Sequence, residues 1–340
     1  MCIIRAMLKI GSVSIKSKLI LAPLSGTTDL PFRAISRAHG CKFAFYEMLD
    51  SSGLAHNHKR TLKMMESAPD DTPIGAQILG SDPDMILESC QIILEHSKPV
   101  LIDLNCACPA KKVIRKKAGS YLLKEPKKCA KIIKKMASSL PVPITVKLRA
   151  RWAKNKGSEG LVLAKIAQDN GAKAVFFHGR DVTQGYAGKV DYEAIREIKK
   201  ALKIPLIASG DILNAKLAQQ MLDMTGCDGL LVARGAMGNP WIFSQIEACL
   251  KNEWIAPPSY EDVKAATLKH LELYRQWRID REKRHNEKYY IGHLRKIAMW
   301  YTKGLPYSKR GREAISAARN YEEVAGVISN AKLRSGSQQL

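Results

Sequence analysis

Short runs of apolar and β-branched residues alternate along the chain with longer segments in which apolar positions recur every three to four residues. The short runs are almost continuously apolar, a pattern typical of parallel strands that are covered on both faces. Eight such strands are predicted, over 19–24, 43–49, 74–79, 100–105, 144–149, 174–179, 205–209 and 229–233. The longer segments predict helices, among them those over 82–96, 127–138, 160–168, 192–201 and 215–224.

Eight strand–helix units in about 240 residues predict an α/β fold, a (β/α)8 TIM barrel. A doubly wound open sheet is the alternative, but the count of eight and the polar residues that end nearly every strand favour the barrel. Local signals agree with the helix boundaries: Asp82 can cap the helix that follows it, and Gly226 follows another helix where a C-terminal cap requires positive φ. Because barrel chemistry takes place at the C-terminal ends of the strands, candidate site residues are expected there.

The pattern changes near residue 252. The segment 252–259 contains Pro257 and Pro258 and is interpreted as a linker, and no similar strand-like run follows it. Four helices are predicted after it, over 260–284, 289–303, 309–318 and 321–330, which together indicate a small all-helical bundle. The predicted domains are a barrel over 1–252, a helical domain over 253–333 and a flexible tail over 334–340.

Charge adds a candidate partner to this picture. The 340 residues include 55 Lys and Arg against 32 Asp and Glu, which gives a formal net charge of +23. A field of this sign attracts polyanions, so nucleic acid is the leading partner; a lysine-rich, well-solvated surface is the alternative. Arg and aromatic residues interleave in the helical region. The charges there favour RNA contacts, whereas the aromatic residues are better explained as the core of the bundle.

Several classes of protein are excluded by pattern and spacing. No run of 18 apolar residues is present and the first nine residues lack the apolar core of a signal peptide, so we expect a cytoplasmic protein without membrane spans. The eight cysteines are scattered, no CxxC pair exists, and Cys106 and Cys108 are too close together for good zinc ligands. We therefore predict no metal site and expect most of the thiols to be buried and reduced.

Polar side chains and glycines cluster where the predicted strands end. They include a thiol, Cys108, an imidazole, His178, and several cations. Glycine-rich turns follow the last two strands, at 209–211 and 234–235, and turns of this kind expose backbone N–H groups that bind phosphate in barrels. The mouth of the barrel is therefore predicted to bind a cofactor or substrate that carries phosphate. The other polar residues at these ends are Gln77, Asn105, Lys147, Arg149 and Arg180.

Seven blocks of sequence, which follow one another along the chain, contain these strand ends. They are APLSGTTDLPFR (22–33), QILGSDP (77–83), DLNCACPAKKV (103–113), VKLR (146–149), FHGRDVTQGYAG (177–188), ASGDI (208–212) and TGCDGLLVARGAMGNPWIF (225–243). Together the blocks resemble the tRNA-dihydrouridine synthases, and GNPWIF is most similar to the bacterial branch. The resemblance implies a barrel that binds FMN, NADPH as the reductant, and tRNA as the substrate; we expect a monomer.

The resemblance also assigns the reaction to Cys108, the cysteine before proline in the family motif. Hydride from reduced FMN would pass to C6 of a uridine, and the Cys108 thiol would deliver a proton to C5, which gives 5,6-dihydrouridine. A thiol with the ordinary pKa of about 8.5 is mostly protonated at neutral pH and can still donate. Cys106 is expected to pack in the core.

Contacts with FMN carry over to the strand ends in the same way. Gln77 would bond the polar edge of the ring, and Lys147 would lie near N1, where a fixed cation favours reduction. His178 would help to hold the phosphate side. Without the family, the residues alone favour an ion-paired strand end for Lys147 and a hydrogen-bonded core histidine for His178. The residues predicted to bind FMN are Pro23, Leu24, Ser25, Gln77, Lys147, His178, Ser209, Gly210, Asp211, Ala233 and Arg234.

Contacts with RNA are predicted on both sides of Cys108. Asn105 would read or position the target uracil, and the basic segment after Cys108 would close over a flipped nucleotide and bind phosphates. A solvated basic loop is the alternative for that segment. Arg180 would reach RNA or the flavin phosphate. The residues predicted to bind RNA are Asn105, Lys111, Lys112, Arg115 and Arg180.

The chain departs from the family pattern at a few positions. Ala107 and Ala233 stand where glycine is usual, Ser209 where asparagine is usual, and Asp181 and Val182 where a Thr-Arg pair is frequent. Ala107 is compatible with the motif only if its φ is negative. Two alternative functions remain: an FMN barrel that acts on a free pyrimidine, like dihydroorotate dehydrogenase, and an RNA-binding barrel without catalysis.

Overall fold

The computed structural model describes residues 7–154, 157–282, 286–303 and 309–331. The predicted flexible tail over 334–340 lies outside these residues. The chain divides into two compact units, one formed by Met1–Asp29 with Cys41–Arg234 and the other by Leu30–Gly40 with Gly235–Leu340. Each unit is described separately below.

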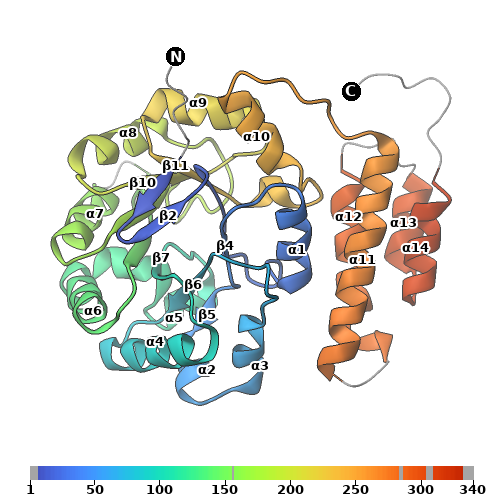
Figure 1. Ribbon diagram of the computed structural model, residues 1–340. Coiled ribbons are helices and arrows are strands. Elements are labelled where there is room, and N and C mark those ends of the chain that lie inside the picture. Colours follow the sequence, from blue (N-terminus) through green and yellow to red (C-terminus); the bar gives the residue numbers. More distant parts are fainter. Residues whose placement is uncertain (1–6, 155–156, 283–285, 304–308, 332–340) are drawn as a thin grey trace. The chain divides into compact units, whose positions relative to one another are not determined.

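The first unit is built on a closed ring of parallel strands (Figure 1). The ring closes because β3 pairs with β11 on one side and with β4 on the other, and β4 then pairs with β6. The predicted eight-stranded barrel is therefore confirmed. In ring order its strands are β3 (Leu19–Leu21), β4 (Ala44–Phe45), β6 (Ile74–Leu79), β7 (Leu101–Cys106), β8 (Ile144–Arg149), β9 (Ala174–His178), β10 (Leu206–Ser209) and β11 (Gly229–Val232).

The second predicted strand, over 43–49, is divided in the structure. Its first part is β4, and its last part forms β5 (Leu49–Asp50), which pairs with the far end of β6. An antiparallel hairpin of β1 (Leu8–Ile10) and β2 (Val13–Ile15) precedes the barrel and was missed by the sequence pattern, because three-residue strands are too short to show a period. The hairpin packs its apolar residues against the buried residues where the strands begin.

Aromatic side chains fill the barrel where its strands begin. The ring centroids of Phe43 and Phe45 lie 5.5 Å apart, and those of Phe45 and Phe176 lie 5.6 Å apart, both in edge-on geometry. A Cβ atom at Gly75 would lie 2.7 Å from the ring of Phe45, so the absence of a side chain there makes room for the ring. The apolar half of the barrel thus leaves the C-terminal strand ends for polar residues.

Helices surround the ring of strands (Figure 1). Helix α4 begins where the Asp82 side chain accepts hydrogen bonds from the backbone N–H groups of Asp84 and Met85, as its predicted cap requires. Helix α9 ends at Gly226, whose φ of 67° confirms the predicted C-terminal cap. The helices of this unit are α2 (Ser51–Ala55), α3 (Lys59–Leu62), α4 (Pro83–Ser97), α5 (Lys111–Arg115), α6 (Pro126–Ser139), α7 (Glu159–Asp169), α8 (Tyr192–Ala201) and α9 (Ala215–Thr225).

The second unit is helical in the part that the structure describes. Its helices are α1 (Leu30–Ala38), α10 (Ile242–Leu250), α11 (Tyr260–Glu282), α12 (Ile291–Tyr301), α13 (Lys309–Ala317) and α14 (Tyr321–Ser329). Tyr274, Tyr290 and Tyr301 are buried in its core, as predicted for the aromatic residues of this region. The unit also includes α1 and α10, so its limits differ from those of the helical domain predicted over 253–333. The domain boundary at residue 252 stays a prediction. None of the described helices has both the length and the apolarity that crossing a bilayer demands.

Removal of the central aromatic ring of the barrel is expected to destabilise it. Phe45→Ala should lower the free energy of unfolding by about 3–5 kcal/mol, because it removes a buried ring and leaves a cavity between two others. Urea denaturation followed by circular dichroism measures this change. Leu213→Ala is the matched control: its side chain is 40% exposed, and its effect should stay within about 0.5 kcal/mol.

Candidate functional site

Polar side chains meet at the C-terminal ends of neighbouring strands, as the barrel predicts. The strand register places Asn105 of β7 beside Lys147 of β8, and His178 of β9 beside both Arg149 of β8 and Ser209 of β10. Residues two apart on a strand point to the same face, so Lys147 and Arg149 project together. The ring therefore assembles in space residues that are far apart in the sequence.

A chain of hydrogen bonds crosses from β6 to the loop after β7. The Gln77 amide nitrogen donates to Asp103 Oδ2 at 2.7 Å, and the Gln77 oxygen accepts from the Asn105 amide nitrogen at 2.7 Å. The Asn105 oxygen then accepts from the backbone N–H groups of Ala107, at 3.0 Å, and Cys108, at 2.9 Å. The Asn105 nitrogen also lies 3.2 Å from the sulfur of Met48. All the hydrogen-bonding positions of Asn105 are thereby filled, which favours a role in shaping this loop over the predicted contact with uracil.

Cys108 and Cys106 occupy different environments, although one residue separates them. Cys108 is half-buried, and its carbonyl oxygen accepts hydrogen bonds from the Ser120 N–H at 3.1 Å and the Ser120 hydroxyl at 2.9 Å. Cys106 is fully buried, its sulfur lies 3.7 Å from that of Cys129, and burial raises its pKa well above the ordinary value. The prediction that Cys106 packs in the core is confirmed.

The loop that carries Cys108 is held from the other side by Arg149. The Arg149 guanidinium donates from Nε to the Ala107 carbonyl at 2.9 Å, and from Nη1 to the carbonyls of Asp181, at 2.9 Å, and Gly185, at 2.8 Å. It therefore joins the loop after β7 to the loop after β9. The sequence pattern placed Arg149 at a strand end without assigning it a role. Its spacing from Lys147 was the signal that could have done so.

Lys147 lies inside the mouth of the barrel. Its ammonium group is 3.4 Å from the Ser209 hydroxyl, which itself donates to the Phe177 carbonyl at 3.1 Å. Burial, together with the positive charge of Arg149, lowers the pKa of Lys147 to about 8. Lys147 is therefore mostly protonated at neutral pH and supplies a fixed cation beside the strand ends.

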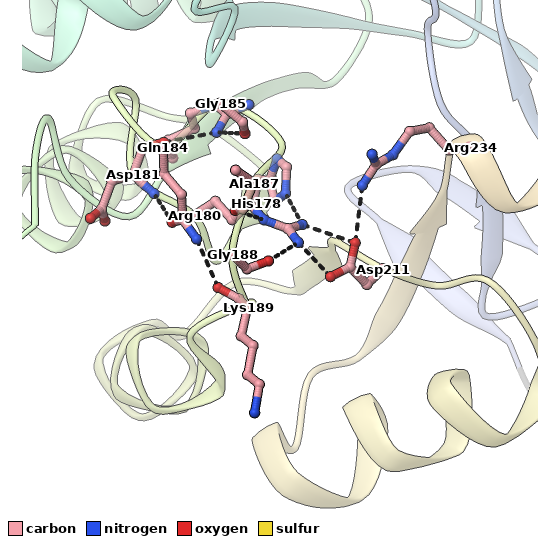
Figure 2. A network of polar contacts seen from close by, with 11 residues as sticks. His178, Arg180, Asp181, Gln184, Gly185, Ala187, Gly188, Lys189, Asp211 and Arg234 are labelled. Atoms are coloured by element: carbon pink, nitrogen blue, oxygen red, sulfur yellow. Dashed lines mark hydrogen bonds and ion pairs between the residues drawn. The ribbon is translucent and has the colours of Figure 1, made fainter.

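Figure 2 shows a second network, in which Asp211 lies between the guanidinium groups of Arg180 and Arg234. Arg180 contacts both carboxylate oxygens of Asp211, at 3.0 and 2.5 Å, and donates to the carbonyls of Ala187, at 3.0 Å, and Gly188, at 2.6 Å. Only 2% of Arg180 is exposed. These contacts favour a structural role for Arg180 in folding the loop after β9, rather than the predicted contact with RNA. Arg234 is much more exposed and keeps donors free for a ligand.

His178 is held neutral by its surroundings. Burial, and to a smaller extent the positive charges of Lys147, Arg149, Arg180 and Arg234, together lower its pKa to about 2. Its Nε2 lies 3.5 Å from a guanidinium nitrogen of Arg180. In this structure His178 can therefore contact an anion by a hydrogen bond but not as an imidazolium.

The turns after β3, β10 and β11 adjoin one another because these strands are neighbours in the ring. Pro23 and Leu24 are half-buried and Ser25 is exposed, so all three reach the rim. Gly210 has a φ of 121°, and a Cβ there would lie 2.7 Å from Val190 and 3.0 Å from His178. The remaining predicted residue of these turns, Ala233, is half-buried. Gly210 therefore lets the turn after β10 pack tightly against Val190 and His178, where a larger residue would collide.

A short basic helix follows Cys108. Helix α5 begins three residues after the thiol, and Lys111, Lys112 and Arg115 are exposed on it, as a phosphate-binding segment requires. Lys116, the next residue, forms an ion pair with Asp50 at 2.9 Å. Within the described residues no group of three or more His, Cys, Asp or Glu side chains could hold a metal ion.

Comparisons with known proteins point to a single family. The family model described as Dihydrouridine synthase (Dus) matches residues 20–335. The chain is 37% identical over 313 residues to a probable tRNA-dihydrouridine synthase of Rickettsia conorii, covering 91% of this chain and 92% of that protein. It is 35% identical over 320 residues to tRNA-dihydrouridine synthase B of Pasteurella multocida, covering 93% of each. The solved complex of 2-naphthoyl-CoA reductase with 2-naphthoyl-CoA shares the fold, with a TM-score of 0.55 and 10% identity over 73% of this chain and 52% of that chain.

The neutral state of His178 predicts a dependence of stability on pH. Because its pKa is about 2 in the folded chain and about 6.5 in an unfolded one, protons bind the unfolded state more readily at mildly acidic pH. Stability is thus retained above about pH 6.5 and lost as the pH falls. Without added ligand, the stability advantage of wild type over His178→Gln should fall by up to about 1.4 kcal/mol per pH unit between about pH 6 and pH 5. Urea denaturation at each pH measures it, and a constant difference would contradict the prediction.

Proposed function

Because the chain belongs to the dihydrouridine synthase family, we propose that it reduces the C5–C6 double bond of specific uridines in tRNA to 5,6-dihydrouridine. Relatives with this named activity match the chain over more than nine tenths of its length. The observation that carries the proposal is the placement of Cys108 at the mouth of the barrel, half-buried and fixed by Asn105. The alternative of a free pyrimidine substrate does not account for the basic helix beside this thiol.

FMN fits the polar rim as the cofactor. Two guanidinium groups, those of Arg180 and Arg234, share the single carboxylate of Asp211, so this corner carries a surplus of positive charge that suits a phosphate. Gly210, in the turn beside this corner, has a φ of 121°, a conformation that favours glycine, and it packs closely against Val190 and His178, which fixes the turn. Bound FMN would supply the reducing equivalents for the C5–C6 bond, and NADPH would be the external reductant.

Two side chains would contact the flavin ring from the strand ends. Lys147 supplies a cation that favours the reduced, more negative ring. Gln77 already donates to Asp103 and accepts from Asn105. Its amide nitrogen keeps one hydrogen and its amide oxygen one lone pair for the polar edge of the ring. His178 would donate or accept one hydrogen bond on the phosphate side as a neutral imidazole.

Cys108 would hold the proton that is delivered to C5 of the uridine. Its loop is fixed at three points: the backbone N–H by Asn105, the carbonyl by Ser120, and the preceding carbonyl by Arg149. A general acid must lie within hydrogen-bond reach of its target, so a rigid loop contributes to the rate. We propose that the protein acts as a cytoplasmic monomer on tRNA, whose phosphates would be bound in part by helix α5.

The proposal is tested by mass spectrometry of tRNA that lacks dihydrouridine, after incubation with the protein, FMN and NADPH. We expect one uridine to gain two hydrogens, and fragment mapping to give its position. Cys108→Ala should lower the turnover rate by about 10²–10⁴, because it removes the general acid. Cys106→Ala, two residues away but buried against Cys129, is the matched control and should retain activity.

Two different negative results would distinguish the two alternative functions, a free pyrimidine substrate and RNA binding without catalysis. Protein that has bound FMN but modifies no tRNA would overturn the proposed substrate, and free pyrimidines would then be assayed. Protein that binds tRNA with a steep salt dependence but no flavin would favour the RNA-binding barrel without catalysis.

Neutralising the basic helix is expected to weaken tRNA binding. For each phosphate that the protein no longer binds, the slope of log affinity against log salt should fall by about 0.9, or about 0.7 for single-stranded segments. The double variant Lys111→Gln with Lys112→Gln should therefore lower both affinity and salt slope, measured by filter binding at several salt concentrations. The control is Lys200→Gln with Lys203→Gln, whose exposed lysines precede β10 and lie at the opposite end of the barrel. Equal effects of the two pairs would contradict a specific role for α5.

A further inference from the structure

Asp103 is a buried acidic group to which the proposed reaction assigns no role. It lies on β7 and is fully buried. Its Oδ1 accepts a hydrogen bond from the Thr145 hydroxyl at 2.7 Å, and its Oδ2 accepts from the Gln77 amide nitrogen at 2.7 Å. Burial raises its pKa to about 7, against the lowering effect of these hydrogen bonds and of Lys147. A carboxyl group in this position costs free energy to desolvate, so its hydrogen bonds have to compensate.

The two ends of the hydrogen-bond chain fix the orientation of both amides between them. The backbone N–H groups of Ala107 and Cys108 can only donate, so Asn105 must turn its oxygen to them and its nitrogen to Gln77. Gln77 must then present its oxygen to Asn105 and its nitrogen to Asp103. Asp103 Oδ2 accepts there whether the carboxyl group is ionised or carries its proton on Oδ1.

We propose that Asp103 is a positioning residue for Cys108: it holds the Gln77 amide in one orientation, and through it the Asn105 oxygen that binds the Cys108 loop. If the Gln77 amide turned over, its nitrogen would face the nitrogen of Asn105. Asn105 would then have to turn as well and would present N–H groups to N–H groups. The proposal deepens the proposed function, on which it rests only in treating Cys108 as the proton donor.

A charge-exchange pair of substitutions tests this orientation. Asn105→Asp still offers one oxygen to the loop, but its second oxygen then faces the Gln77 oxygen. Asp103 keeps the Gln77 amide from turning over, so the two oxygens stay opposed. Asp103→Asn releases that restraint, because an amide can present either its nitrogen or its oxygen to Gln77. In the double variant Gln77 can turn over, donate to the carboxylate introduced at position 105 and accept from the amide introduced at position 103. The second substitution should therefore rescue the first.

The readout is hydrogen exchange at the backbone amides of Ala107 and Cys108 in the full-length protein, followed by mass spectrometry of overlapping peptides. Exchange in Asn105→Asp should be about tenfold faster than in wild type, whereas Asp103→Asn alone and the double variant should stay within about threefold of it. The turnover number on tRNA should follow the same order while KM changes little. Thr145→Val, which removes only the bond to Oδ1, is the matched control and should leave the exchange of both amides unchanged.

The proposal would be overturned if the amides of Ala107 and Cys108 exchanged equally fast in Asn105→Asp and in the double variant with Asp103→Asn. If Asn105→Asp does not fold, the melting temperature takes the place of exchange, and failure of Asp103→Asn to restore folding would overturn the proposal in the same way. Hydrogen exchange does not depend on turnover. A protein that modified no tRNA would therefore refute the proposed function and leave the role of Asp103 open to this test.

Discussion

The pairing of β3 with β11 on one side and with β4 on the other closes the sheet, and the site depends on this closure. In an open sheet β3 and β11 could lie at opposite edges, and the turn at Pro23 would be far from the turn at Arg234. Closure brings both turns and the other strand ends to one rim. The rings of Phe43, Phe45 and Phe176 fill the end where the strands begin, so polar groups are confined to the other end.

Positive charge dominates this rim before any ligand arrives. Lys147, Arg180 and Arg234 surround His178, and Asp211 bridges two of the three cations. Burial and this field together hold His178 neutral, while Lys147 keeps its proton at neutral pH despite its burial. Because protein contacts already orient these groups, an anion that binds there meets fixed charges and little reorganisation is needed, which is the arrangement that stabilises charge most effectively.

Much of the barrel could be predicted because its strands are continuous apolar runs. The predicted strands over 74–79 and 144–149 coincide with β6 and β8 to the residue. The division of the second strand into β4 and β5 could not be predicted, since it depends on which part of β6 each half pairs with. Residue types at the strand ends identified the site, but their partners did not follow. The bond from Arg149 to the Ala107 carbonyl joins segments 42 residues apart, and no local pattern carries that information.

The structure also shows how the chain accommodates its departures from the family pattern. Ala107 is not among the described residues with positive φ, so its methyl group is compatible with the turn before Cys108, as the motif requires. Its N–H and carbonyl are both bonded, to Asn105 and Arg149. Ser209 has no side-chain amide, but its hydroxyl accepts from the Lys147 ammonium group and donates to the Phe177 carbonyl of the neighbouring strand β9. At both positions side chains at the strand ends supply the hydrogen bonds, so the substituted residue is held within the same network that positions the rim.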